Sequence, residues 1–272
     1  MKKYSEALGH GEERVFAIED MVYQGQTAFQ HVDIIRATGY GMVLFLNGER
    51  QSSEADEFIY HEMLVHPAMF RHPNPKRVFI AGGGEGAVGR EILKHKTVET
   101  ITQVDIDANL IELCRRYLPS WSAGAYEDSR LNLVNGDARA YLRETAERYD
   151  IIFLDLPEWS PDTPARELYT VDFYTLVRER LTPGGVMGLQ VGPVHPVHIT
   201  PFVTVAQRIR EAFNDVMLYP VTELRWGFGL CANVLPHDLP FDATRLSAPL
   251  HYYNTELHTH LGAVPTYIQQ AL

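Results

Sequence analysis

Hydrophobic and polar positions follow one pattern near the start of the chain and another after it. Residues 31–37 and 42–51 alternate between apolar and polar side chains, and a glycine-containing turn at 38–41 joins them. This pattern predicts a strand, a turn and a second strand. Within residues 56–70 the apolar side chains instead recur at helical spacing, which predicts a helix.

From residue 77 onward, short apolar runs alternate with segments of helical pattern. The apolar runs predict strands at 77–84, 99–107, 130–137, 149–156, 186–191, 215–221 and 226–234. The other segments predict helices at 85–95, 108–118, 138–147, 171–181 and about 201–213. Strands that alternate with helices form a parallel sheet covered on both faces, and such α/β sheets bind ligands beyond the carboxyl ends of their strands.

A proline-rich link, HPNP at residues 72–75, lies close to the point where the pattern changes. We therefore expect a small N-terminal β-strand domain over residues 1–66 and an α/β domain over residues 67–272. No internal repeat or low-complexity tract interrupts either part.

The chain carries a net charge of −11, because 24 lysines and arginines stand against 35 aspartates and glutamates. A general nucleic-acid binder would show a basic surface, so the charge argues against that class. An acidic protein raises the local concentration of cations, which fits a cationic small-molecule substrate. The alternative is that the charge only keeps the protein soluble.

The sequence shows no motif of a membrane or metal protein. No run of about 18 apolar residues is present, and the N-terminus lacks the apolar core of a signal peptide. Cys114 and Cys231 form no CxxC motif, so we expect both to be reduced and buried. We expect a cytoplasmic protein with no bound metal and with neither nucleic acid nor membrane as a partner.

The first candidate for chemistry is the turn GGGEG at residues 82–86. Gly82 and Gly84 would allow a tight turn and a close approach of the backbone to a ligand. Asp105 ends the next predicted strand, where a carboxylate accepts hydrogen bonds from ribose hydroxyls. These residues fit either a nicotinamide dinucleotide or an adenosyl sulfonium compound.

A second acidic strand end favours the adenosyl sulfonium. Asp137 follows the third strand of the α/β region, and enzymes that use S-adenosylmethionine commonly bind the adenine amino group with an acid at this place. Taken singly, Asp105 or Asp137 could instead be a helix N-cap or a solvated loop residue. Three matching strand ends weaken that alternative.

Several long motifs run through the chain. They are QSSEADEFIYHE (51–62), HPNPKRVFIAGGGEG (72–86), YLPSWSAGAYEDSRLNLVNGDARAYL (117–142), ARELYTVDFYTLVRERLTPGGVMGLQVG (165–192) and HYYNTELHTHLGAVPTYIQQ (251–270). Over nearly the whole chain they resemble the polyamine aminopropyltransferases, the spermidine synthase family. The GGGEG and VDID variants are similar to the subgroup of thermophiles that aminopropylates agmatine.

This resemblance implies a methyltransferase-like Rossmann domain, with a mostly parallel seven-stranded sheet, beside the N-terminal β-domain. The donor would be decarboxylated S-adenosylmethionine and the by-product methylthioadenosine. The acceptor would be a polyamine or another amine, such as putrescine or agmatine. The family also implies a homodimer or homotetramer that assembles through its N-terminal strands.

The same resemblance assigns a donor-binding set: Gln30, Gln51, His61, Gly82, Gly84, Glu85, Asp105, Asp137 and Ala138. Glu85 would hold the terminal amine of the donor and Asp105 its ribose. Asp137 and Ala138 would contact the adenine, and His61 would lie beside the donor. Gln30 and Gln51 would reach the donor from the N-terminal domain.

Three further residues would be catalytic. Asp155 would hold the attacking amine, and Tyr60 would line the junction between the aminopropyl group and the acceptor. Glu158 falls at the position of the usual Asp base in the lid. An amine with a pKa of about 10 must lose its proton before it can attack, and a carboxylate beside it can bind the cation and then accept that proton.

The acceptor side departs from the family pattern in two places. In the lid, residues 155–165, Glu158 replaces an aspartate and Trp159 replaces a proline. In the segment from Tyr219 to Trp226, a glycine- or serine-containing turn is missing and Arg225 is present, which we expect to point outward.

Two alternatives to aminopropyl transfer therefore stay open. One is a methyltransferase that uses intact S-adenosylmethionine, or a paralogue with an altered acceptor. The other is a catalytically silent binding paralogue. Glu85 should repel the carboxylate of intact S-adenosylmethionine, which favours the decarboxylated donor.

Overall fold

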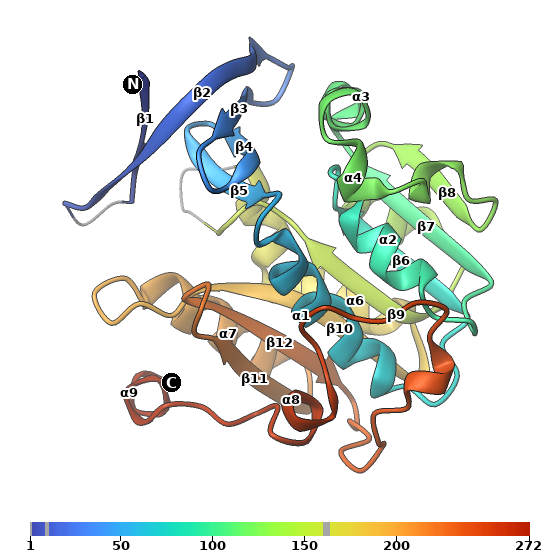
Figure 1. The fold of residues 1–272 in the computed structure, drawn as a ribbon. Coiled ribbons are helices and arrows are strands. Elements are labelled where there is room, and N and C mark those ends of the chain that lie inside the picture. Colours follow the sequence, from blue (N-terminus) through green and yellow to red (C-terminus); the bar gives the residue numbers. More distant parts are fainter. Residues whose placement is uncertain (1, 9–10, 160–163) are drawn as a thin grey trace.

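The computed structural model describes residues 2–8, 11–159 and 164–272 and contains two sheets (Figure 1). The first is a five-stranded antiparallel sheet whose strands follow each other in sequence order. Its strands are β1 (Lys2–Ala7), β2 (Glu13–Gln26), β3 (His31–Ala37), β4 (Gly41–Leu46) and β5 (Glu49–Ser53). The predicted N-terminal β-structure is confirmed.

Two details of this sheet differ from the prediction. A single strand over 42–51 is wrong, because the chain turns at Asn47 and Gly48, whose φ angles are 52° and 84°. An Asn-Gly pair adopts the left-handed conformation that a two-residue hairpin turn requires, so β4 and β5 form a hairpin. β1 and β2 were not predicted, and the irregular pairing of β2 with β3 around Asp20 and Tyr23 interrupts any strict alternation there.

The second sheet has seven strands in the order β11-β12-β10-β9-β6-β7-β8. Their bounds are β6 (Arg77–Gly82), β7 (Thr100–Asp105), β8 (Leu131–Asn135), β9 (Tyr149–Asp155), β10 (Leu181–Pro193), β11 (Asp215–Val221) and β12 (Trp226–Ala232). The five strands from β10 to β8 run parallel, whereas β12 runs antiparallel to both β10 and β11. The predicted mostly parallel α/β sheet is confirmed.

Helices cover both faces of the second sheet. The longer ones are α1 (Glu57–Phe70), α2 (Ala87–Leu93), α3 (Ala108–Tyr117), α5 (Ala138–Glu144), α6 (Val171–Arg180) and α7 (Thr200–Ala212). Shorter turns, absent from the prediction, are α4 (Pro119–Ser122), α8 (Thr255–Thr259), α9 (Thr266–Ala271), η1 (Ala125–Glu127), η2 (Pro164–Tyr169) and η3 (Ala243–Arg245). α1 and α2 pack on one apolar core with Ile80 and Phe153, whereas α5, α6 and α7 pack on the other with Phe79 and Leu154.

Helix α1 connects the two sheets and is buried on every side from His61 to Phe70. It packs against α2 and against β9, β10 and β12. The C-terminal segment crosses it (Figure 1), and the carboxylate of Glu62 accepts the backbone hydrogens of residues 251, 252 and 253 at 2.7 to 2.8 Å. Because an unpaired buried carboxylate is costly, these bonds hold the segment on α1. α1 spans residue 66, and the domain boundary there stays a prediction.

Four parallel strands end at one edge of the sheet, at Gly82, Asp105, Asn135 and Asp155. The chain passes from β6 to β7 and β8 on one side and returns to β9 on the other. The topological switch point therefore lies between β6 and β9, where ligands bind in sheets of this kind.

Three general features can be stated for the described residues. Cys114 and Cys231 are free and buried, as predicted. Within the described ranges, no helix is long and apolar enough to cross a membrane. In the same part of the chain, no three or more His, Cys, Asp or Glu side chains form a group that could hold a metal ion.

Candidate active site

The turn after β6 brings its backbone against two other strand ends. Gly82 and Gly83 have φ angles of 82° and 71°, a region that favours glycine. A Cβ atom on Gly82 would collide with the carbonyl of Asp155, and one on Gly84 would lie 3.0 Å from the carboxylate of Asp105. Gly82 and Gly84 therefore let two predicted site carboxylates lie close to the same turn.

Asp105, at the end of β7, is linked to the N-terminal sheet through a second aspartate. Its Oδ1 accepts the backbone hydrogen of Asp107 at 2.8 Å. Oδ2 of Asp107 accepts hydrogen bonds from Oγ1 of Thr27 at 2.6 Å and Nε2 of Gln30 at 2.9 Å. Gln30 thus approaches the predicted ribose site through Asp107. Burial raises the pKa of Asp105 to about 6.

Asp137 and Ala138 begin α5 at the neighbouring strand end. Oδ1 of Asp137 accepts the backbone hydrogens of Arg139 and Ala140, at 2.7 and 3.0 Å. This is the N-cap role considered as the alternative for a single acid. Since both bonds go to Oδ1, the cap leaves Oδ2 out of these contacts, and the two roles are compatible.

Glu85, in the glycine-rich turn, has a side chain that is 16% exposed. Its Oε2 accepts the hydroxyl hydrogen of Ser52 at 2.8 Å, and Oγ of Ser52 accepts the indole hydrogen of Trp121 at 2.9 Å. Burial raises the pKa of Glu85 to about 7, against the opposing charge of His61 and with added repulsion from Asp155. A cationic ligand would favour the ionised form of such a carboxylate.

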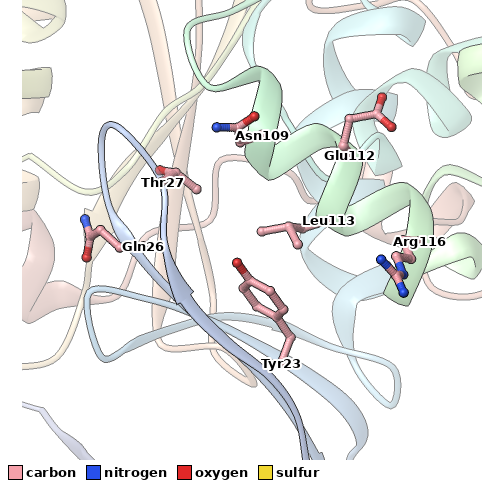
Figure 2. A pocket seen from close by; sticks show the side chains of 7 residues that line it. All are labelled: Tyr23, Gln26, Thr27, Asn109, Glu112, Leu113 and Arg116. Atoms are coloured by element: carbon pink, nitrogen blue, oxygen red, sulfur yellow. The ribbon is translucent and has the colours of Figure 1, made fainter.

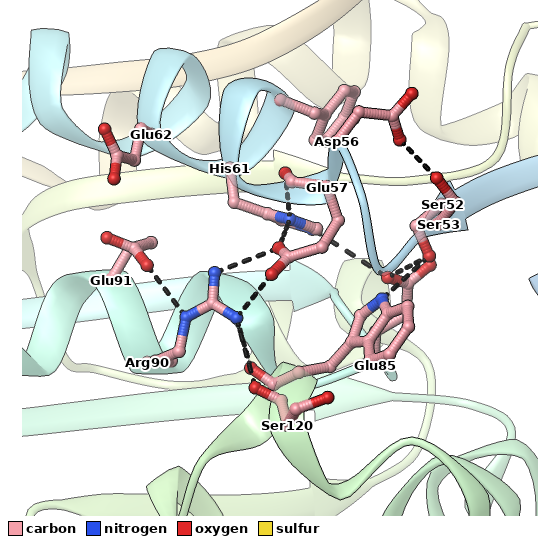
Figure 3. Close-up of polar contacts among 12 residues, drawn as sticks. Ser52, Ser53, Asp56, Glu57, His61, Glu62, Glu85, Arg90, Glu91 and Ser120 are labelled. Carbon is pink, nitrogen blue, oxygen red and sulfur yellow. Dashed lines mark hydrogen bonds and ion pairs between the residues drawn. The ribbon is translucent and has the colours of Figure 1, made fainter. Parts of the chain in front are cut away.

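His61 faces Glu85 from α1, and its side chain is 4% exposed (Figure 3). Nδ1 donates to Oε2 of Glu57 at 2.7 Å, and Nε2 lies 3.9 Å from Oε2 of Glu85. Arg90 donates to both carboxylate oxygens of Glu57, at 2.8 and 2.9 Å. Burial alone would lower the pKa of His61, but the hydrogen bond and charge of Glu57 raise it to about 9. The imidazole is therefore a cation at neutral pH.

Tyr60 and Asp155 meet although 95 positions separate them in the sequence. The Tyr60 hydroxyl donates to Oδ1 of Asp155 at 3.0 Å, and its ring packs edge-on against Phe228 with centroids 5.1 Å apart. Burial raises the pKa of both the hydroxyl and the carboxyl group. Tyr60 is thus a neutral donor that fixes one oxygen of Asp155.

The described part of the lid is anchored to α7 and η2. The guanidinium of Arg208 lies 4.9 Å from the ring centroid of Trp159, and the hydroxyl of Tyr169 donates to the carbonyl of Pro157 at 2.8 Å. These contacts attach the segment just after Asp155 to the face of the sheet that carries α7. Residues 160–163 of the predicted lid lie outside the described residues.

Glu158 stands between these two anchors. Its side chain is 27% exposed, and Oε1 lies 3.6 Å from Nε2 of His198. Burial raises the pKa of Glu158 to about 7, and the charge of Glu49 adds to that shift. A carboxyl group with a pKa near the working pH is suited to accept and release a proton.

The second departure from the family pattern lies on β11 and β12. Tyr219 is 2% exposed and its hydroxyl donates to a backbone carbonyl of α1, so it is a core residue. Arg225 is exposed, as predicted. Trp226 donates its indole hydrogen to Oε1 of Gln190 at 3.1 Å, and Nε2 of Gln190 donates to the carbonyl of Leu156 at 3.2 Å. Trp226 thus supports the base of the lid from β12.

One predicted residue stays apart from this cluster. Gln51 is exposed, and its amide donates to the carbonyl of Glu49 at 3.1 Å. Among the contacts known for the described residues, none joins Gln51 to another predicted site residue.

A groove of about 370 Å³ lies between the β2–β3 turn and α3 (Figure 2). Its lining residues are Tyr23, Gln26, Thr27, Asn109, Glu112, Leu113 and Arg116. None of them belongs to the predicted site, although Thr27 also bonds to Asp107. The groove is therefore a neighbour of the strand-end cluster.

Sequence reasoning missed the layer of residues behind Glu85. Ser52 bonds to Glu85, Glu57 bonds to His61, and Arg90 bonds to Glu57. Ser52 and Glu57 lie within the QSSEADEFIYHE motif, so their position was a signal. Which way each side chain points depends on how β5, α1 and α2 pack, and the sequence does not show that.

Family models match both parts of the chain. A spermidine synthase tetramerisation domain matches residues 4–54, and a spermine/spermidine synthase domain matches residues 57–229. A polyamine aminopropyltransferase of Aeropyrum pernix is 36% identical, over 94% of this chain and 85% of the relative. A polyamine aminopropyltransferase of Pseudomonas syringae pv. tomato is also 36% identical, over 100% and 98%.

Solved structures agree with these matches. A spermidine synthase in complex with the transition-state analogue AdoDATO superposes with a TM-score of 0.92 and 31% identity, over 99% of this chain and 94% of that one. The spermidine synthase of Thermotoga maritima gives a TM-score of 0.90 and 31% identity, over 100% and 94%. The predicted resemblance is thereby confirmed for the sequence and for the fold.

Proposed function

The chain belongs to the spermine/spermidine synthase family, and we propose that it moves the aminopropyl group of decarboxylated S-adenosylmethionine to an amine and releases methylthioadenosine. It is an enzyme, a polyamine aminopropyltransferase, as its relatives are named. The donor, the by-product and the roles of single residues are the proposed parts.

The observation that carries the choice of donor is the buried carboxylate of Glu85. Decarboxylated S-adenosylmethionine ends in a cationic amine, whereas the intact compound adds a carboxylate beside that amine. Glu85 is 16% exposed and Asp155 is close enough to raise its pKa. Two carboxylates would attract the amine and repel a third carboxylate, which supports the decarboxylated donor.

The proposed donor site follows the strand ends. Asp105 and Asp137 would bind ribose and adenine, with Ala138 beside the adenine. Gly82 and Gly84 would let the backbone approach the nucleoside, since a Cβ atom at either place would meet the end of another strand. We keep Gln30 and Gln51 as contacts from the N-terminal domain, with His61 beside the donor.

The acceptor would react beside Asp155. An amine bound there as a cation gives its proton to a carboxylate, Asp155 or Glu158, and its lone pair attacks the carbon next to the sulfonium. The new carbon–nitrogen bond forms as the carbon–sulfur bond breaks, and sulfur keeps the electron pair as a neutral thioether. Tyr60 would hold Asp155 in place through its 3.0 Å hydrogen bond.

A mass-spectrometric assay tests this function. Decarboxylated and intact S-adenosylmethionine are each offered with putrescine, cadaverine, agmatine and spermidine. We expect a mass gain of one aminopropyl group on at least one amine, together with methylthioadenosine, and only with the decarboxylated donor. Methyl transfer from the intact compound, without aminopropyl transfer, would refute the proposal. Nucleoside binding with no turnover would identify a silent paralogue.

We also propose a homodimer or homotetramer in the cytoplasm. The match of residues 4–54 to a spermidine synthase tetramerisation domain supports an oligomer. Light scattering after size-exclusion chromatography would give about two or four times the 30.9 kDa chain mass. A mass equal to one chain at micromolar concentration would contradict it.

A further inference from the structure

The donor-binding carboxylate is backed by a row of alternating charges. Glu85 is followed by His61, then Glu57, then Arg90, and Arg90 also donates through Nε to Glu91 at 2.8 Å (Figure 3). These residues come from α1, from α2 and from the turn between β6 and α2. Their side chains are between 1% and 16% exposed. Each charge thus meets an opposite one with little water between them.

We infer that Glu57 is a positioning residue that holds His61 as a cation against Glu85, and so keeps Glu85 ionised for the donor amine. This inference rests on the proposed function, in which Glu85 binds that amine. Glu57 itself does not touch the substrate in this scheme. It acts through the imidazole.

The geometry gives Glu57 control over the imidazole. Its carboxylate takes the Nδ1 hydrogen of His61 at 2.7 Å, and its backbone carbonyl lies 2.8 Å from the same nitrogen. Arg90 donates hydrogen bonds to both carboxylate oxygens of Glu57, and these bonds fix the orientation of the carboxylate toward His61. Nε2 is therefore aimed at Glu85, 3.9 Å away.

Every charged group around His61 affects its protonation. Glu57 faces Nδ1 from the same helix, Glu85 faces Nε2 from the glycine-rich turn, and Asp155 adds negative charge from the end of β9. Arg90, behind Glu57, is a cation that would disfavour a charged imidazole if Glu57 were neutral. Removing the charge of Glu57 therefore leaves a buried imidazole without the carboxylate that bonds to Nδ1, and we expect the imidazole to lose its proton.

The consequence reaches Glu85. Burial raises the pKa of Glu85, and the positive charge of His61 is what opposes that shift. A neutral His61 would raise the pKa of Glu85 further above 7, so that most of Glu85 would be protonated at pH 7.5, and a protonated Glu85 cannot attract the donor amine by charge. Donor affinity should therefore depend on Glu57 although the two do not meet.

The first test is a titration of the wild-type protein by heteronuclear NMR, with the His61 signal assigned through His61→Gln. We expect His61 to keep its proton at pH 8 and to lose it near pH 9. A wild-type His61 that is neutral at pH 7.5 would overturn the inference, whether or not any variant folds.

The second test compares Glu57→Gln with Glu91→Gln, a matched control in the same network that touches Arg90 but not His61. At pH 7.5 we expect Glu57→Gln to neutralise His61 and to raise the donor KM about tenfold, with a smaller change in kcat. Glu91→Gln leaves Glu57 and its bond to His61 in place, so it should keep the His61 titration and keep the donor KM within about twofold of wild type. Glu57→Asp should restore the charge of His61 and part of the donor affinity.

Equal effects of Glu57→Gln and Glu91→Gln on the donor KM would show a merely structural role and refute the inference. So would a neutral His61 in Glu57→Gln with an unchanged donor KM. If the wild type transfers no aminopropyl group at all, the proposed function fails, and the titration still decides whether Glu57 keeps His61 charged.

Discussion

The proposed donor site and the proposed acceptor lid both contain a glutamate whose pKa burial raises to about 7, yet the protein holds these two glutamates differently. Glu85 is bonded to Ser52 and faces His61, and each of these has a buried partner of its own. Oε1 of Glu158 lies 3.6 Å from Nε2 of His198, whose side chain is 40% exposed. The donor carboxylate is thus fixed by the fold, whereas the lid carboxylate can change partners when a substrate enters.

This difference agrees with the family pattern expected from the sequence. The residues proposed for the donor follow the family motifs, and their partners come from several packed elements. The lid carries the substitutions, Glu158 and Trp159, on a segment with few partners among the described residues. A network of buried charges tolerates few changes, because each removal leaves a buried charge uncompensated. We therefore expect substitutions in the lid to alter the choice of acceptor and to leave the donor site intact.

Asp155→Asn should have the largest effect on turnover. We expect kcat to fall by about 10²- to 10⁴-fold, because the attacking amine loses the carboxylate that binds it and helps to remove its proton. Binding of methylthioadenosine, measured by calorimetry, should be nearly unchanged. Asp150→Asn is the matched control, since Asp150 lies at the other end of β9 and accepts backbone hydrogens of residues 76 and 77. Wild-type turnover in Asp155→Asn would contradict this role.

Glu85→Gln should have the next largest effect. The amide keeps the shape and the Ser52 contact but not the charge, so we expect the donor KM to rise about 10- to 100-fold with a smaller change in kcat. The preference for decarboxylated over intact S-adenosylmethionine should fall as well, since one repulsive carboxylate is gone. Initial rates with both donors measure this. An unchanged preference would mean that another group distinguishes the decarboxylated donor from intact S-adenosylmethionine.

Glu158→Gln tests whether the lid carboxylate accepts the proton. Above its pKa of about 7 Glu158 is ionised and can accept a proton, so kcat at saturating substrates should rise as the pH passes through 7. The variant should lose about tenfold in kcat and lose this rise, with the donor KM unchanged. Glu158→Asp should keep both. A variant with the wild-type pH profile would place the base elsewhere.

The smallest effect is expected from Trp159→Pro, which restores the residue usual in the family. The stacking of Arg208 on the indole contributes about 0.5 to 1 kcal/mol, so the free energy of unfolding should fall by about that amount. Trp159→Phe keeps an aromatic ring and is the control. Rates with the four amines should change relative to each other, while the donor KM stays constant. A changed donor KM would show that lid and donor site are coupled.

The sequence could predict the strand ends because each depends on local pattern. Asp105, Asp137 and Asp155 each follow an apolar run, and parallel strands that share an edge bring such ends together. The Asn47-Gly48 pair is also a local hairpin signal, and the prediction of a single strand over 42–51 did not take it into account.

Contacts between distant elements could not be predicted in this way. Ser52 meets Glu85 and Arg90 meets Glu57 only because β5, α1 and α2 pack in one register, which no local pattern records. The same holds for the hydroxyl of Tyr219, which donates to a backbone carbonyl of α1 inside the core. A shift of β5 by one residue in its pairing would move its side chains to the opposite face of the sheet, and Ser52 would then point away from Glu85.

The bond between Glu62 and residues 251–253 has a consequence for protein synthesis. Glu62 directly follows His61 on α1, and its carboxylate is fully buried. A nascent polypeptide that stalls, or is cut, before residue 251 would leave that carboxylate without these backbone donors, in the helix that carries Tyr60 and His61. The helix that carries two proposed site residues thus depends on a segment that is synthesised much later, and we expect a chain that ends before residue 251 to be inactive.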